Sequence, residues 1–241
     1  MKRFYAPPDQ FQDQTVALTK EETRHLRDVL RMKPGDEAQV FDGHGHEFLT
    51  TIATIGKRET ILQIIREIEA PAPESSLDLT MVASVYKNDK FDLVVQKAVE
   101  LGVSKMTPIV SLRSEAKLEP TMKRTERWRK IALESTKQCE RAKVMSIDEP
   151  TTFAEFITRL PADSGSLLMF SEKDGRSIPD MPGEKKITAL VGPKGGWDDS
   201  EIQLAEERGF IPLKLGRRIM KAETAAITFA AILQNRFGDL N

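Results

Sequence analysis

Two successive glycine-rich turns, each placed between an apolar run and a helix, constrain the fold of this chain more than any other feature. The apolar run 187–191 predicts a buried strand, and it breaks at Gly192-Pro193-Lys194-Gly195-Gly196, which neither a strand nor a helix tolerates. A second apolar run, 211–215, ends at Gly216, and an Ala-rich helix is expected over about 222–233. Repeated strand–turn–helix units predict an α/β fold that binds a ligand at the carboxyl ends of its strands.

Either turn could serve a ligand, because glycine lets the backbone approach a flat molecule closely, but glycines also simply turn a chain. The first turn is not a Walker A loop, since no Gly-Lys-Ser/Thr follows at the required spacing, and it is not a GxGxxG dinucleotide loop. The helix over 222–233 is apolar around most of its circumference and too short to span a membrane. We therefore expect it in a core or an interface.

The chain is expected to divide into three parts. Residues 1–70 form a small strand-rich domain, 71–76 a linker stiffened by prolines, and 77–241 an α/β domain with a parallel sheet covered on both faces. In the first domain, Thr19 to Glu22 (TKEE) predicts a capping box at the start of a helix. Further strands are expected over 37–42, 47–55, 60–68, 77–85, 106–110, 144–147 and 166–170, and further helices over 89–101, 122–139, 153–160 and from 198–200 to 209.

Charge and cysteine content limit the class of protein. The formal net charge of the 241 residues is −1, so a surface for nucleic acid must be local. One such region, 113–143, holds ten Lys and Arg against five Glu, which suits a phosphate backbone or an ordinary solvated helix face. The single Cys139 excludes an internal disulfide, and the N-terminus lacks an apolar signal core, so a cytoplasmic protein is expected. His44 and His46 lack metal-ligand spacing, so no metal is expected.

The carboxyl-terminal third resembles a known family. It reads GPKGG, then E-I, G-F, LG-x-R-I-M-K-x-ET-A and RFGDL, from Gly192 to Leu240, and HLRDVLRMKPGD near the N-terminus matches as well. This pattern resembles the RsmE-type ribosomal RNA methyltransferases of the SPOUT superfamily. The resemblance implies a PUA-like β-barrel followed by an α/β SPOUT domain tied in a trefoil knot. It also implies methylation of uracil N3 in 16S ribosomal RNA by S-adenosylmethionine, and a homodimer formed through the apolar helix.

The resemblance also implies the roles of residues. The methyl donor would be held by backbone groups and small side chains of the two turns: Leu190, Gly192, Pro193, Gly195, Gly196, Leu215, Gly216, Ile219, Met220 and Ala225. Candidate catalytic residues are Arg218, Lys221 and Glu223, although Glu223 could equally cap the following helix. Candidate RNA contacts are His25, Arg27, Arg31, Arg113 and Arg141, and the resemblance further singles out Lys87, Lys97, Glu100 and Gln138.

Two departures from the family pattern leave alternatives open. Lys194 stands where the family has glutamate, and Lys221 where arginine is common, although lysine cannot reproduce bidentate pairing. The alternatives are methylation of another RNA position, including a ribose 2′-oxygen, and a catalytically weak RNA-binding protein of the same fold.

Overall fold

The computed structural model describes residues 1–86, 89–172 and 175–240, without the side chain of Pro120. The chain forms two compact units. The first contains Met1–Glu74 together with Thr136–Val144, and the second contains Ser75–Ser135 and Met145–Asn241. Lys87, which the family resemblance singles out, lies outside the described residues.

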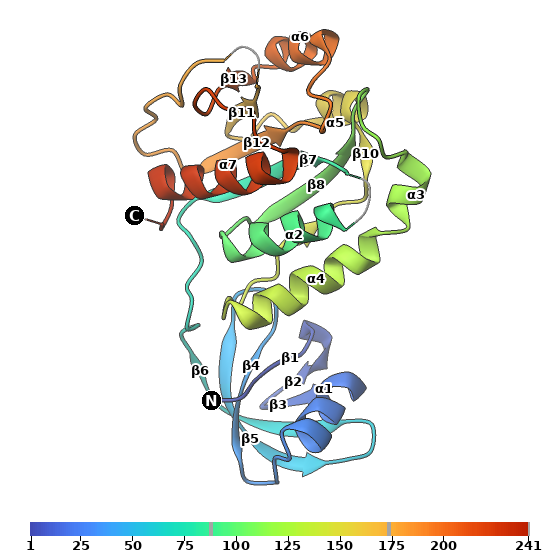
Figure 1. Ribbon diagram of the computed structural model, residues 1–241. Coiled ribbons are helices and arrows are strands. Elements are labelled where there is room, and N and C mark those ends of the chain that lie inside the picture. Colours follow the sequence, from blue (N-terminus) through green and yellow to red (C-terminus); the bar gives the residue numbers. More distant parts are fainter. Residues whose placement is uncertain (87–88, 173–174, 241) are drawn as a thin grey trace. The chain divides into compact units, whose positions relative to one another are not determined.

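The first unit is built on a curled sheet whose described strands follow the order β1-β4-β5-β6-β3-β2 (Figure 1). Thr19 accepts a hydrogen bond from the backbone N–H of Glu22, 3.4 Å, so the Thr19 half of the expected capping box is confirmed and the helix starts where TKEE predicts. The core is apolar, with Phe4, Leu26 and Ile52 at or below 1% exposure. The elements are β1 (Arg3–Tyr5), η1 (Pro8–Gln10), β2 (Phe11–Gln12), β3 (Thr15–Leu18), α1 (Lys20–Arg24), η2, a π-helical turn (His25–Val29), β4 (Glu37–Phe41), β5 (Glu47–Ile55) and β6 (Thr60–Ile68).

The segment 136–144 belongs to the first unit because Arg141 lies inside it. The Arg141 side chain is 6% exposed and pairs with Glu74 at 2.5 Å, while the Arg141 carbonyl accepts a hydrogen bond from Arg3 at 2.7 Å. This position corrects the expected RNA contact at Arg141: its guanidinium is buried in an ion pair and offers no surface to a phosphate.

The second unit is a parallel sheet whose described strands follow the order β10-β8-β7-β12-β11-β13, with β9 beside β8. The chain runs from β7 outward through β8 to one side, and β12, β11 and β13 lie on the other side. The elements are β7 (Asp78–Ser84), α2 (Lys90–Glu100), β8 (Lys105–Val110), α3 (Leu118–Met122), α4 (Thr125–Gln138), β9 (Ser146–Ile147), β10 (Thr151–Thr152), α5 (Phe153–Arg159), β11 (Ser166–Phe170), β12 (Lys186–Val191), α6 (Asp199–Glu207), β13 (Ile211–Leu213) and α7 (Ala222–Phe237).

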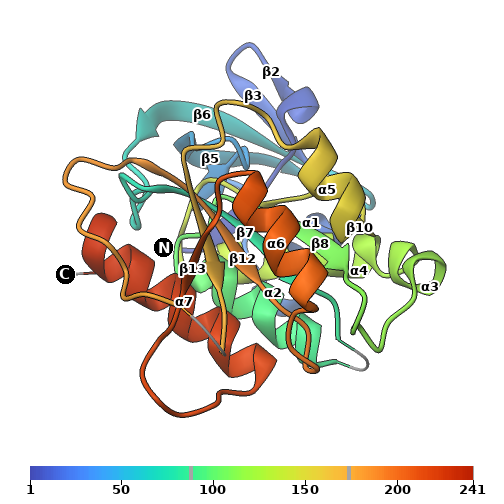
Figure 2. The ribbon, with the colours of Figure 1, turned by 90° about the horizontal axis from the view of Figure 1, so that it is seen from above.

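Helices cover both faces of this sheet, as a parallel sheet requires (Figures 1 and 2). Alternate residues of β12 point to opposite faces of the sheet. On one face, Leu190 packs with residues of α5 and α6, among them Phe153 and Ala205. On the opposite face, α7 lies against α2 and β12, and Phe229 of α7 packs near Phe170, with ring centroids 6.1 Å apart. No helix among the described residues is long and apolar enough to cross a membrane.

The structure departs from the expected elements mainly in short segments, among them β2 and β3 of the first unit. Helix α4 confirms the helix expected over about 122–139 but begins at Thr125, after the separate short helix α3 ends at Met122. Short strands at Arg3–Tyr5 and Thr151–Thr152 were not expected, because two or three residues show no periodicity.

Candidate functional site

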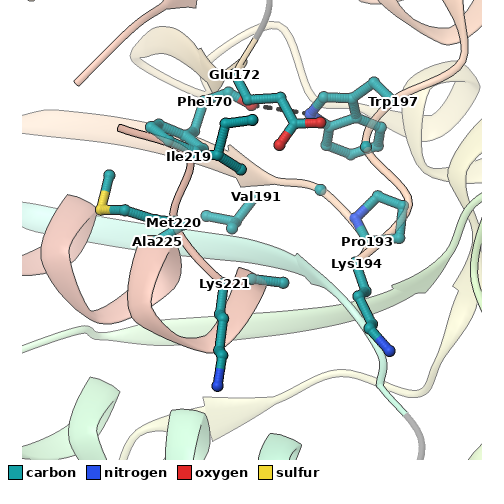
Figure 3. Close-up of a pocket in the computed structure, with 13 residues that line it drawn as sticks. Phe170, Glu172, Val191, Pro193, Lys194, Trp197, Ile219, Met220, Lys221 and Ala225 are labelled. Carbon is teal, nitrogen blue, oxygen red and sulfur yellow. Dashed lines mark hydrogen bonds between the residues drawn. The ribbon is translucent and has the colours of Figure 1, made fainter. Parts of the chain in front are cut away.

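A cavity of about 240 Å³ opens beside the first glycine turn (Figure 3). Three segments line it: the end of β11 with the residues that follow, the turn after β12, and the turn that leads into α7. The parallel register places the ends of β11 and β12 side by side, with Phe170 opposite Val191. The cavity residues are Phe170, Glu172, Val191, Gly192, Pro193, Lys194, Gly196, Trp197, Ile219, Met220, Lys221, Ala222 and Ala225.

Trp197 explains why position 192 is glycine. Its indole is 4% exposed, packs against Phe153 with ring centroids 5.3 Å apart, and donates from Nε1 to the carbonyl of Phe170 at 2.9 Å. A Cβ at Gly192 would lie 2.8 Å from that Nε1, closer than such contacts allow. The indole thus forms one fixed wall of the cavity, and the glycine lets the backbone lie against it.

Gly196 faces a second side chain that the sequence analysis missed. Its φ of +71° is a left-handed conformation that favours glycine, and a Cβ there would lie 2.6 Å from Oε1 of Glu172. Figure 3 shows the Glu172 carboxylate beside Trp197 at the cavity. Because Glu172 follows β11 and no motif surrounds it, only the parallel register could have indicated that it reaches the glycine turn.

The structure brings six of the ten expected donor-binding residues to this cavity: Gly192, Pro193, Gly196, Ile219, Met220 and Ala225. Four others do not line it. Leu190 is buried in the core beneath, and a Cβ at Gly195 would face Arg113 at 3.2 Å. Leu215 and Gly216 belong to the second turn, where Gly216 has φ +72° and no atom within 4 Å of an added Cβ.

A smaller cavity of about 100 Å³ adjoins the first and shares Pro193 and Lys194 with it. Its other walls are Val85, Tyr86, Lys90, Glu115 and Glu223. Lys90 donates to Glu223 at 2.8 Å, and the Lys194 ammonium lies 3.7 Å from Glu115. The sequence analysis named only Pro193, Lys194 and Glu223 among these residues.

The three candidate catalytic residues lie in different surroundings. Lys221 lines the larger cavity and Glu223 the smaller one, while Arg218 is exposed and lines neither. The hydrogen bond from Lys90 is the main cause that lowers the pKa of the Glu223 carboxyl, so this group is a carboxylate near neutral pH and a weak proton acceptor. Its place in the first turn of α7 also fits the expected favourable interaction with the helix dipole.

The remaining candidate RNA contacts are at least partly exposed. Arg113 pairs with Asp198, the N-terminal cap of α6, at 2.9 Å and keeps 39% of its side chain exposed. Arg27 pairs with Asp28 at 2.7 Å, and His25 and Arg31 are exposed. Gln138 and the Lys97–Glu100 pair, 2.8 Å apart, lie away from both cavities.

The larger cavity fits an adenosine-type methyl donor better than a metal. Phe170, Trp197 and Ile219 offer apolar surface, the turn after β12 offers backbone groups, and Glu172 offers one carboxylate. Among the described residues no group of His, Cys, Asp or Glu could hold a metal ion.

Comparisons with known proteins agree with this geometry. A family model for an RNA methyltransferase domain matches residues 73–234, and one for an RNA methyltransferase PUA domain matches residues 18–65. Fold, site and models therefore define an RNA methyltransferase with a PUA domain.

Individual relatives identify the family within this class of RNA methyltransferases. The ribosomal RNA small subunit methyltransferase E of Buchnera aphidicola is 32% identical over 95% of this chain and 94% of its own length. The enzyme of that name from Neisseria gonorrhoeae, solved with S-adenosyl methionine, is 32% identical, covers 100% of both chains and superimposes with a TM-score of 0.89. A putative methyltransferase from Legionella pneumophila, solved with the same cofactor, is 32% identical over 99% of this chain and 98% of its own, with a TM-score of 0.86. The chain belongs to the ribosomal RNA small subunit methyltransferase E family.

The family and the mixed α/β class predicted from the sequence are thereby confirmed. The trefoil knot and the roles of individual residues stay predictions.

Proposed function

We propose that this chain transfers a methyl group from S-adenosylmethionine to N3 of a uridine in small-subunit ribosomal RNA. The cavity walled by Gly192, Gly196 and Trp197 carries the proposal, because two relatives at 32% identity were solved with this donor. The relatives' shared name supplies the ribosomal RNA, and N3 of uridine is what the family resemblance implies. The same proposal places the protein in the cytoplasm.

The donor supplies a methyl group already activated by a sulfonium. The S–CH₃ bond breaks with its electron pair left on sulfur, an N3–CH₃ bond forms, and the N3 proton leaves. The protein's task is to orient both partners and to favour loss of that proton. The rigid indole of Trp197 and the backbone at Gly192 and Gly196 would fix the donor, while buried Phe170 would present apolar surface to it.

Nearby cations would stabilise the uracil anion that forms when N3 loses its proton. Lys221 lines the larger cavity, Lys90 the smaller one and Lys194 both, so their ammonium groups are the candidates. Figure 3 shows the side chains of Lys194 and Lys221 extending to the same side. The hydrogen bond from Lys90 lowers the pKa of the Glu223 carboxyl and makes it a weaker base than a free glutamate, so we propose that loss of the N3 proton depends chiefly on stabilisation of the anion by these cations.

As RNA contacts we propose Arg113 in the second unit and, separately, His25, Arg27 and Arg31 in the first unit. All four are exposed or half-exposed, which a phosphate contact requires. We also propose a homodimer formed through α7. Ile227, Ala231 and Ile232 of α7 keep part of their apolar surface exposed, and Ile219 in the preceding turn is 81% exposed. Light scattering on the purified chain would test the dimer, and a monomer at micromolar concentration would refute it.

The decisive experiment is labelled methyl transfer to small ribosomal subunits that lack the modification, followed by mass spectrometry of the nucleosides. Formation of 3-methyluridine is the expected result. A different methylated nucleoside would indicate another RNA position. Absence of both transfer and donor binding in calorimetry would indicate an RNA-binding protein of the same fold.

A further inference from the structure

The hydroxyl of Tyr86 is buried and has no hydrogen-bond partner within the described part of the chain. Tyr86 is 6% exposed, its ring packs edge-on against Phe91 with centroids 5.8 Å apart, and its Oη finds no partner among the described residues. Nearly all buried polar side-chain atoms are hydrogen-bonded, and an unpaired one costs free energy. A bound ligand would supply the missing partner.

Tyr86 lines the smaller cavity, which lies where α/β sheets bind ligands. Tyr86 follows the end of β7, and Pro193 follows the end of β12. The two strands are parallel neighbours, and the chain leaves them toward opposite sides of the sheet. In open α/β sheets, ligands bind at such a reversal of strand order, outside the carboxyl ends of the strands.

The smaller cavity also adjoins the larger one. Pro193 and Lys194 form walls of both, so a group in the smaller cavity would lie next to a donor in the larger one. In-line methyl transfer requires this adjacency, because the acceptor atom must approach the methyl carbon directly.

The charges around the smaller cavity balance. Lys90 pairs with Glu223 at 2.8 Å and Lys194 with Glu115 at 3.7 Å, so two cations face two anions. Burial, and then the charge of Glu223, raise the pKa of the Tyr86 hydroxyl, which therefore stays protonated and able to donate. Such a pocket suits a flat, uncharged group with carbonyl oxygens rather than a phosphate.

Resting on the proposed function, we propose that the smaller cavity receives the uracil base to be methylated, unstacked from the RNA chain, and that Tyr86 donates a hydrogen bond to one of its carbonyl oxygens. Enzymes that modify a base usually take it out of the stack into a pocket. Lys90 and Lys194, held by their glutamates, would then face the base whose N3 loses a proton. Tyr86 would thus contact the uracil that accepts the methyl group, and not the methyl donor.

The test is Tyr86→Phe, which removes only the hydroxyl, compared with Tyr5→Phe. Tyr5 is the one other tyrosine in the sequence and lies in β1 of the first unit. For Tyr86→Phe we expect kcat/KM for the RNA to fall about tenfold, the value of one hydrogen bond in a desolvated pocket. We expect its donor affinity to stay unchanged and its melting temperature not to fall, since no intramolecular hydrogen bond is lost. Tyr5→Phe should leave all three unchanged.

The possible outcomes separate the two proposals. Absence of transfer by the wild-type protein would refute the proposed function itself. Transfer by the wild type with an unchanged kcat/KM in Tyr86→Phe would overturn the base pocket alone, as would a tenfold loss of donor affinity. Photocrosslinking gives a readout that does not depend on turnover. The protein is mixed with RNA that carries 5-iodouridine at the methylated position and is irradiated without S-adenosylmethionine. A crosslink at Tyr86 is expected, and one confined to residues outside the smaller cavity would contradict the proposal.

Discussion

Gly192→Ala should damage both the fold of the second unit and its larger cavity. The added Cβ would lie 2.8 Å from Nε1, 2.9 Å from Cε2 and 3.2 Å from Cδ1 of Trp197. The indole cannot simply withdraw, because it is 4% exposed, packed on Phe153 and hydrogen-bonded to the carbonyl of Phe170. Relief of the clash therefore requires the indole to move or the hydrogen bond to break.

The cost follows from these contacts. Overpacking of a buried site costs about 1–3 kcal/mol, and leaving a buried donor and acceptor unpaired costs about as much. Replacing glycine by alanine also restricts the unfolded chain, which returns about 0.4–1 kcal/mol where the native backbone accepts alanine. We expect a net loss of about 2 kcal/mol in unfolding free energy, and a melting temperature lower by about 4–8 °C.

The assay combines thermal melts with calorimetry of S-adenosylmethionine binding. Donor affinity should fall at least about tenfold, because Gly192 and Trp197 both line the cavity. Gly195→Ala is the matched comparison from the same turn: its Cβ would meet Arg113 at 3.2–3.3 Å, a contact that a small shift relieves. Its losses should be less than half as large. Wild-type stability and donor affinity in Gly192→Ala would refute the role given to the Trp197 wall.

Three further substitutions test other parts of the structure. Lys90 lowers the pKa of the Glu223 carboxyl, so the stability that this carboxylate adds is present above its unfolded pKa of about 4.3 and is lost as pH falls through the folded value. In melts across pH, Glu223→Gln should cost under about 1 kcal/mol at pH 7 and progressively less as the pH is lowered into that range. Arg141→Ala should cost about 3 kcal/mol in urea unfolding because it leaves Glu74 unpaired, and an unchanged midpoint would contradict the buried pair. Arg113→Ala should lower the dependence of log RNA affinity on log salt by about 1, whereas an unaltered slope would remove Arg113 from the RNA surface.

Local chemistry made much of this fold predictable. Strands 47–55 and 60–68 alternate in sequence and appear with those bounds, and the Thr19 cap forms as TKEE predicts. The expected Asp198 cap of α6 is likewise present, with Glu201 completing a capping box. These features depend on residues close together in the chain, where spacing alone specifies the interaction.

Features that depend on distant residues were not predictable. Glu172 and Trp197 reach the cavity only because β11 and β12 pair in one register. Tyr86 reaches the smaller cavity only because β7 pairs with β12, where Val82 lies opposite Leu190, 108 residues later in the chain. At Arg141 the sequence suggested a contact that the structure does not favour. Its charge and motif indicated an RNA contact, but the side chain is buried in an ion pair with Glu74.

The structure shows how lysine is accommodated at position 194, where the family has glutamate. Lys194 lies 3.7 Å from Glu115, so its charge is balanced locally, and both side chains remain largely exposed. An exposed pair of this kind contributes little to stability, which leaves Lys194 able to shift toward a newly formed negative charge. Because Lys194 lines both cavities, that charge would be the anion of a base in the smaller one. We therefore expect lysine at this position to be compatible with activity.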